Sequence, residues 1–290
     1  MRYRPLGARG QVVSAVSLVL EPEGGRRSAG DWISLIYSAL ECGVCGFEVR
    51  GLDKALSEAL AHAFTSVDRH LAFIVLRLDD RRGSGSLAEV GPQIKEVLVR
   101  TRIGYLDAIL LHEPLGPMPP ALRELAALKT AGVVRFLGVA GQGEQVDRLV
   151  AEGRLDILST AYSLLSGWAE RRRIREAMAS DMGVLGYGVY PREQLEPLIG
   201  RRPQNRKDPL VGMGGYSFLE VTREWTAEEL CTAYALTETA LASVLVRPRS
   251  IEHVEQMAAV ADRDLPSGVA AQIEMARFSG LGGDAGRRSA

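Results

Sequence analysis

This chain of 290 residues has few cysteines, no long apolar run and no excess of charge of either sign. It has 3 cysteines, too few for a disulfide framework. Its longest apolar runs have the length of a strand, and none approaches the roughly 20 residues of a membrane span. The net charge is −1, so no global field attracts nucleic acid or an anionic membrane. The first residues, MRYRPLG, lack the apolar segment of a secretory signal, and we expect a cytoplasmic protein.

Two of the cysteines, Cys42 and Cys45, form a C-x-x-C pair. In redox proteins such a pair opens a helix, whose N-terminus lowers the pKa of the thiol. Here a helical pattern precedes the pair and a strand-like run follows it. No second Cys or His pair has the spacing of zinc ligands. We therefore expect two small buried thiols and no metal site.

The chain does contain a regular alternation of apolar, strand-sized runs and helical patterns. Arg2–Leu6 and Gln11–Val13 flank a glycine-rich turn, which predicts an N-terminal β-hairpin. The predicted strands are Val13–Leu20, Val44–Val49, His70–Leu78, Leu106–His112, Val133–Ala140, Leu155–Tyr162, Gly183–Tyr190 and Leu241–Val246. The helices predicted to follow them are Asp31–Cys42, Leu52–Phe64, Leu87–Arg102, Pro120–Ala131, Glu144–Glu152, Ala169–Ser180, Thr226–Thr239 and Ser250–Ala261. Eight such units predict an α/β fold of the (β/α)8 TIM barrel type, since a doubly wound sheet would need fewer strands or a second domain.

Three further segments complete this interpretation. Leu265–Phe278 predicts an extra C-terminal helix, so residues 1–279 are expected to form a single barrel domain. Residues 280–290 are rich in Gly, Arg and Ser and are expected to form a flexible tail. The connection Pro191–Trp225 is long for a compact barrel and follows the seventh strand, which favours a lid or a partner-binding loop at the C-terminal mouth.

One predicted strand, within the stretch LDAILLHEP at Leu106–Pro114, ends in a histidine. Its continuous apolar run is typical of a strand buried on both faces. In a closed parallel barrel, chemistry takes place at the C-terminal ends of the strands. His112 is therefore a candidate site residue, although an isolated histidine in such a place is more often structural.

The turn after the eighth strand predicts an anion site. Arg247 and Arg249 supply charge there, and Ser250 can cap the next helix, whose N-terminus offers free N–H donors. The loops after strands seven and eight are a recurring phosphate-binding place in barrels. An ordinary helix cap beside solvated arginines fits the same residues.

In order and spacing, these segments resemble the aldo-keto reductase superfamily over about residues 1–262. The segments that carry the likeness are the N-terminal hairpin with the first strand, Ala39–Phe47, LDAILLHEP, Val133–Gly138, Ala161–Leu165 and Arg249–Val254. The resemblance implies a barrel that binds a nicotinamide dinucleotide in its C-terminal mouth and reduces carbonyls. It also implies a catalytic set in which Tyr donates a proton, Lys lowers the pKa of that Tyr, Asp orients the Lys and His polarises the carbonyl.

Only the histidine of that set is retained, as His112. Glu48 aligns with the aspartate and Arg77 with the lysine, while no lysine lies within residues 55–94 and no tyrosine within 38–104. Arginine stays charged and cannot serve as the acid. Because a general acid typically contributes about 10²–10⁴-fold, we predict weak or absent carbonyl reduction.

The cofactor positions are partly retained. By the resemblance, Tyr187 matches the tyrosine that stacks on the nicotinamide, and Arg249 and Ser250 match contacts to the adenosine phosphate. The cofactor-binding residues expected on these grounds are Tyr187, Arg247, Arg249, Ser250 and Glu252. Ala140, Gly141 and Ser159 replace polar residues near the carboxamide. We expect NADH or NADPH to bind, and one arginine does not decide between them.

The same loss of catalytic residues is similar to that of KidO-type NADH-binding homologues in bacteria, which act on cell division and on a cell-cycle kinase. That resemblance implies a pseudoenzyme that senses the nucleotide and regulates a tubulin-like division protein and a histidine kinase. The first alternative is an active NAD(P)H-dependent oxidoreductase, or a redox-neutral lyase or isomerase in which Glu48 and His112 form an acid–base pair. The second is a structural adaptor without a ligand.

Overall fold

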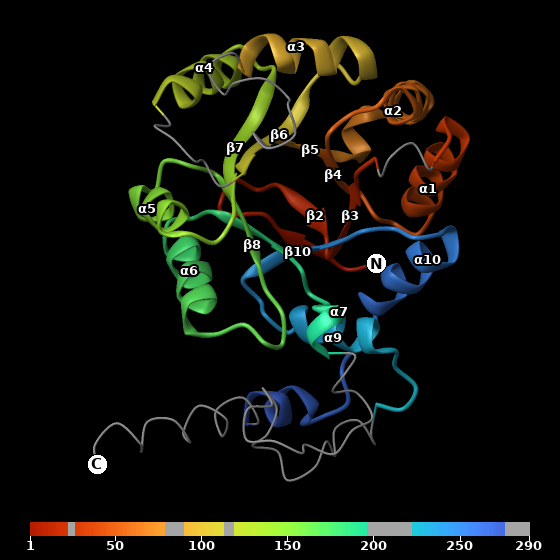
Figure 1. The fold of residues 1–290 in the computed structure, drawn as a ribbon, viewed down its shortest axis with the longest axis vertical. Helices are drawn as coiled ribbons and strands as arrows, with labels where there is room; N and C mark the ends of the chain where they lie inside the picture. The colour runs from red at the N-terminus through yellow and green to blue at the C-terminus, as the bar shows by residue number, and fades with distance from the viewer. Residues whose placement is uncertain (23–26, 79–89, 113–118, 196–221, 276–290) are drawn as a thin grey trace.

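Eight parallel strands close into a barrel, so the predicted (β/α)8 fold is confirmed. The computed structural model describes residues 1–22, 27–78, 90–112, 119–195 and 222–275. The strands neighbour one another in chain order, and the last one closes the ring between the first and the seventh (Figure 1). They are β3 (Val16–Leu20), β4 (Gly46–Arg50), β5 (Phe73–Leu78), β6 (Leu106–His112), β7 (Val134–Ala140), β8 (Ile157–Ala161), β9 (Gly183–Tyr187) and β10 (Leu241–Val246).

The helices surround this barrel. They are α1 (Ala29–Glu41), α2 (Lys54–Ser66), α3 (Val90–Thr101), α4 (Pro119–Thr130), α5 (Glu144–Glu152), α6 (Trp168–Ala179), α9 (Ala227–Ala235) and α10 (Ile251–Val260), with a 3-10 turn η1 (Arg69–Leu71) before β5. Residues 269–275 are also helical, within the predicted C-terminal helix. In the part of the chain that the structure describes, no helix is long and apolar enough to cross a membrane.

The predicted long connection Pro191–Trp225 is described only at its two ends. It begins with a short helix, α7 (Arg192–Leu195). Residues 196–221, where the lid or partner-binding loop was expected, lie outside the described residues, as does the predicted tail 280–290.

The N-terminal segment departs from the prediction of one strand over Val13–Leu20. The hairpin consists of β1 (Tyr3–Pro5) and β2 (Val12–Ser14), and the barrel strand β3 begins only at Val16. Ser14 causes the break, because its Oγ donates to the Val16 carbonyl (2.7 Å) and accepts from the N–H of Cys45 (3.0 Å). The apolar run hides this turn, since residues on both sides of it are buried.

Side chains alternate along the strands between the barrel interior and the layer beneath the helices, as the period of two requires. The lower interior is apolar and includes Phe73 and Phe136, whereas Leu18 and Ile109 pack outward against the helices. Toward the C-terminal ends of the strands the interior positions become polar. The apolar lower half supports a polar mouth.

The three cysteines are free. Cys231 is buried, but Cys42 and Cys45 are only half-buried, so the expectation of two buried thiols is wrong for that pair. Burial, with help from nearby carboxylates, raises the pKa of the Cys42 thiol, which is opposite to the shift that a reactive thiolate requires. Burial also raises the pKa of Cys231, to about 12.

Candidate functional site

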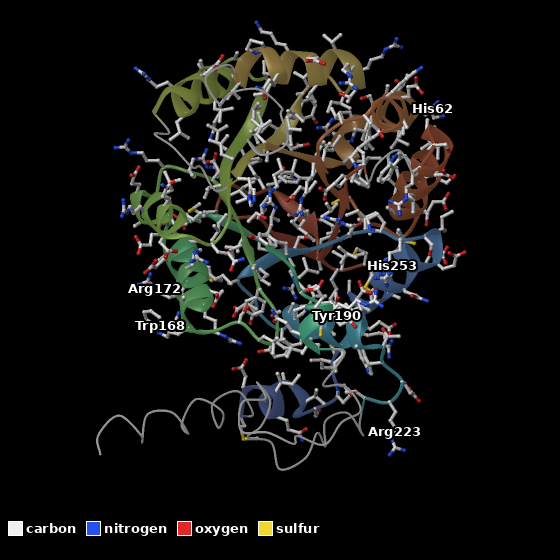
Figure 2. All side chains as sticks on the ribbon, viewed as in Figure 1. His62, Trp168, Arg172, Tyr190, Arg223 and His253 are labelled. Atoms are coloured by element: carbon white, nitrogen blue, oxygen red, sulfur yellow. The ribbon has the colours of Figure 1, made fainter. Side chains whose placement is uncertain are left out.

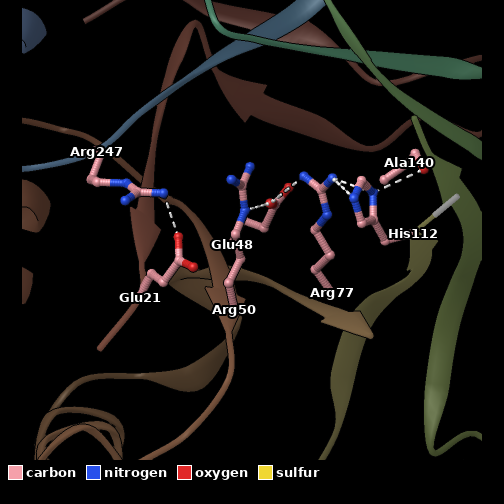
Figure 3. Close-up of polar contacts among 7 residues, drawn as sticks. All are labelled: Glu21, Glu48, Arg50, Arg77, His112, Ala140 and Arg247. Atoms are coloured by element: carbon pink, nitrogen blue, oxygen red, sulfur yellow. Dashed lines mark hydrogen bonds and ion pairs between the residues drawn. The ribbon is translucent and has the colours of Figure 1, made fainter. Parts of the chain in front are cut away.

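Charged side chains gather at the C-terminal ends of neighbouring barrel strands (Figure 3). These residues are Arg247 after β10, Glu21 after β3, Glu48 and Arg50 on β4, Arg77 on β5 and His112 at the end of β6. They converge because strand ends in a parallel barrel meet at one rim, and because interior positions recur every second residue. Arg50 follows Glu48 by two positions and therefore shares its face of the sheet.

Glu48 is fully buried and binds two guanidinium groups through one oxygen. The Nε of Arg50 donates to Oε1 of Glu48, and Nη1 of Arg77 lies 3.5 Å from the same oxygen. A buried carboxylate needs such cations, since its desolvation is otherwise too costly. Its second oxygen, Oε2, is enclosed and hydrogen-bonds no residue that the structure describes.

Arg77 also binds His112, the histidine predicted from the strand end. Its Nη2 contacts Nδ1 of the ring and lies 3.3 Å from Nε2, while Nδ1 lies 3.2 Å from the carbonyl oxygen of Ala140. A guanidinium only donates, so a ring nitrogen that bonds it must be unprotonated. We therefore assign a neutral ring to His112 in this arrangement. Arg77 contacts both Glu48 and His112 and separates the two residues of the predicted acid–base pair.

Tyr187, at the end of β9, completes what we call the mouth cluster: Glu48, Arg50, Arg77, His112 and Tyr187. The guanidinium carbons of Arg77 and Arg50 lie 5.2 and 5.9 Å from its ring centroid, within the range of cation–π attraction. The ring that the resemblance assigns to nicotinamide stacking is thus bordered by two cations.

Ser159 lies on β8, where it pairs with Leu185 of β9, two residues before Tyr187. It is fully buried, and its Oγ hydrogen-bonds nothing among the described residues. The N–H of Gly141 donates to the Ser159 carbonyl at 2.9 Å, which places the replaced pair Ala140–Gly141 beside it. An enclosed hydroxyl without a partner has unused capacity for a hydrogen bond to a ligand.

Arg247, predicted to bind an anion, forms an ion pair with Glu21 across the rim (Figure 3). The Glu21 side chain is only 3% exposed, so this pair is anchored in the wall of the barrel. Glu21 was not among the sequence candidates. The sequence could have indicated Glu21, because it is a carboxylate that comes directly after a buried strand.

The N-terminus of α10 holds the other predicted anion residues. Ser250 caps the helix and accepts from the N–H of His253 at 3.2 Å. The Glu252 side chain bonds its own N–H and Ser250, and both contacts lower the pKa of Glu252. Arg27 donates to the carbonyls of Pro248 and Arg249 and holds the turn in place. The residues predicted for an anion site therefore lie together at this helix end.

The cation of this helix end is already paired within the chain. The guanidinium of Arg249 binds Glu228 on α9. His253 lies on α10 (Figure 2), and its Nε2 is 3.2 Å from the other oxygen of that carboxylate. Burial acts to raise the pKa of Glu228, but the contacts with His253 and Arg249 outweigh it and the pKa is lowered. The Glu228 carboxylate is thus bound to the guanidinium of Arg249, which we expected to bind a phosphate.

Two side chains, Asp53 and Arg50, lie near the place where the resemblance expects the proton-donating tyrosine. Asp53 follows β4 but caps α2, where its Oδ1 accepts from the N–H of Leu56 at 2.7 Å, so it is a structural residue. Arg50, absent from the sequence candidates, occupies the mouth itself. Among the residues that the structure describes, no group of three or more His, Cys, Asp or Glu side chains is arranged to hold a metal ion.

Comparison with known proteins agrees with this architecture. The model of the Aldo/keto reductase family matches residues 52–277, beginning two residues after Arg50. An aldo-keto reductase from Bacillus halodurans in its holo form superposes with a TM-score of 0.74 at 19% identity, over 95% of this chain and 96% of its own. One from Klebsiella pneumoniae in complex with NADPH superposes with a TM-score of 0.76 at 18% identity, over 97% and 96%. No curated protein matches the chain in sequence.

Proposed function

The chain belongs to the aldo/keto reductase family, and on that basis we propose that it binds a nicotinamide nucleotide, no longer reduces carbonyls and acts as a regulator through protein partners. The observation that supports this most is the mouth cluster. Arg77 stands where the resemblance places the lysine, and it binds Glu48 on one side and His112 on the other. A fixed cation in that position can orient a neutral histidine but cannot give up a proton.

The residues of the mouth are compatible with a dinucleotide. Tyr187 offers a ring for the nicotinamide, and Ser250 caps a helix end suited to the adenosine phosphate. The hydroxyl of Ser159, which bonds none of the described residues, can serve the carboxamide. When bound, the nucleotide supplies hydride chemistry, which we propose this chain leaves unused. The NADPH complex of the Klebsiella pneumoniae protein gives a precedent for binding in this fold.

The charge of the mouth cluster favours the reduced nucleotide. Arg50 and Arg77 carry two positive charges against the single negative charge of Glu48, and His112 is neutral in this arrangement. The oxidised nicotinamide ring is cationic and the reduced ring is not. We therefore propose NADH as the ligand that is sensed.

The test of the regulatory role is the effect of NADH on partner binding. Following the KidO-type resemblance, the partners proposed are a tubulin-like division protein and a histidine kinase. Coupling between two sites typically amounts to about 1–3 kcal/mol, so we expect NADH to change partner affinity by about 5–150-fold. Calorimetry with each partner, with and without saturating NADH, measures this change. Tyr187→Ala, which removes the proposed stacking ring, should abolish it, and equal affinities in the wild type would refute the regulatory role.

The Arg249–Glu228 ion pair predicts a preference for NADH over NADPH, because a 2′-phosphate would lie beside the Glu228 carboxylate and compete with it. Glu228→Gln removes that competitor and should raise NADPH affinity by about tenfold, the value of one charged hydrogen bond, with little effect on NADH. Parallel titrations of the two nucleotides measure the ratio. Glu255→Gln, an exposed change of the same kind on the neighbouring helix α10, is the matched control. An unchanged ratio in the Glu228 variant would contradict the assignment.

A further inference from the structure

A buried arginine of α6, Arg173, lies outside both the mouth cluster and the helix end of α10. Its side chain is only 4% exposed, although α6 packs beside α5 on the outside of the barrel (Figure 1). Its Nε donates to Oδ1 of Asp147 on α5 (2.5 Å), and its Nη1 donates to Oγ1 of Thr160 on β8 (3.3 Å). Its Nη2 donates to the carbonyl oxygen of Gln142. Arg173 therefore reaches from the helix layer to the loop that follows β7.

This loop, residues 141–143, lies at the C-terminal rim of the barrel and contacts the candidate site through its backbone. The N–H of Gly141 donates to the carbonyl oxygen of Ser159 at 2.9 Å. The carbonyl oxygen of Ala140, directly before the loop, lies 3.2 Å from Nδ1 of His112. A shift of the loop would therefore be felt on two sides of the mouth.

Two glycines give the loop little rigidity of its own. Gly141 has a φ of 143°, in the region that favours glycine, and Gly143 caps α5 without a side-chain hydrogen bond. The bond from Arg173 to the carbonyl between these glycines supplies rigidity from outside. A buried ion pair is weak evidence for stability, since well-packed apolar residues often stabilise a fold as well. The buried cation is therefore better explained by the loop conformation that it fixes.

We propose that Arg173 is a positioning residue for the nicotinamide end of the bound nucleotide. It does not touch the nucleotide. By holding the carbonyl of Gln142, it keeps residues 141–143 against β8 and keeps Ala140 beside His112. One wall of the mouth is then ordered before the ligand arrives, so binding does not have to order it. This role rests on the proposed function, which assigns the nicotinamide ring to Tyr187.

Titration of each variant with NADH and with ADP-ribose, which lacks the nicotinamide ring, tests the proposal. Arg173→Leu fills the buried space without the hydrogen bonds, so it should weaken NADH binding by about tenfold and leave ADP-ribose binding unchanged. Arg173→Lys keeps the charge but loses the fork, and its loss should be intermediate. Arg172→Leu is the matched control, because this half-exposed neighbour contacts the same Asp147 (3.4 Å), and it should change neither affinity.

Hydrogen exchange of the nucleotide-free protein reports on the loop itself. The N–H of Gly141 should exchange faster in Arg173→Leu than in the wild type, and Arg172→Leu should match the wild type. Thermal unfolding checks that each variant is folded, and Arg173→Lys decides if the leucine variant is not.

A selective loss of NADH affinity together with faster exchange would support the positioning role. Equal losses for NADH and ADP-ribose, or unchanged exchange at Gly141, would overturn it. Failure of the wild type to bind NADH would refute the proposed function, whereas wild-type binding that Arg173→Leu leaves intact would refute the positioning role alone.

Discussion

Replacing Asp107 with alanine should lower the free energy of unfolding by about 3–5 kcal/mol, because it leaves the largely buried guanidinium of Arg69 without its counter-charge and the buried N–H of Ile74 without its acceptor. Asp107 lies on β6, near the end opposite His112, and is 1% exposed. Its Oδ2 accepts from Arg69 (2.7 Å) and from the N–H of Ile74 on β5 (2.8 Å), and its Oδ1 accepts from Arg135 on β7 (2.9 Å). One carboxylate thus links three adjacent strands.

Urea unfolding followed by circular dichroism measures this loss. Asp107→Asn keeps the shape and one acceptor oxygen but removes the charge, so it should cost less than the alanine variant. Glu58→Ala breaks an exposed helix pair with Lys54 and should cost only about 0.3–0.5 kcal/mol. A loss below about 1 kcal/mol in Asp107→Ala would show that the buried network contributes little to stability.

The second large effect concerns catalysis. With NADH and a panel of aldehydes and ketones, the protein should turn over at least about 10²–10⁴-fold more slowly than an active member of the family, the factor that one general acid contributes. The reason is local. Hydride addition creates an alkoxide, and the groups that face it are a permanently charged Arg77 and a neutral His112 bound to it.

Variants separate this expectation from the alternative of an altered enzyme. His112→Ala should leave the residual rate at the buffer level, and Arg77→Lys should not restore reduction, since the tyrosine is still missing. A measurable turnover that His112→Ala or Glu48→Gln abolishes would instead favour the acid–base alternative, in which these two residues carry out the chemistry.

The barrel was predictable because its signal is local and repeated. Each strand is a short apolar run, each helix has its own periodicity, and eight such units admit few closed arrangements. The turn at Ser14 was not predictable, because the strands on both sides of it are buried and read as one run. Its cause, a bond from Ser14 to the start of β4, is a tertiary contact.

The candidate site also has a part that the sequence predicts and a part that it does not. His112 was predicted from its place at the end of a strand, and Glu48 and Arg77 from their alignment with the catalytic residues of the family that the chain resembles. The pairing of Arg247 with Glu21 joins residues 226 positions apart, and that of Arg249 with Glu228 joins a strand-end turn to a helix. Such long-range ion pairs leave no periodic trace in the sequence. These ion pairs decide whether an arginine is available to a ligand, and the local sequence around the arginine does not show them.

The most direct test of the central claim, that this barrel binds NADH without using it, is NADH fluorescence during titration with the protein and then during incubation with the carbonyl panel. We predict a saturable change with one site per chain, weak competition by NAD⁺, and a signal that stays constant once the carbonyls are added. No saturation would contradict the binding claim, and a decay faster than that of the protein-free blank would contradict the loss of catalysis.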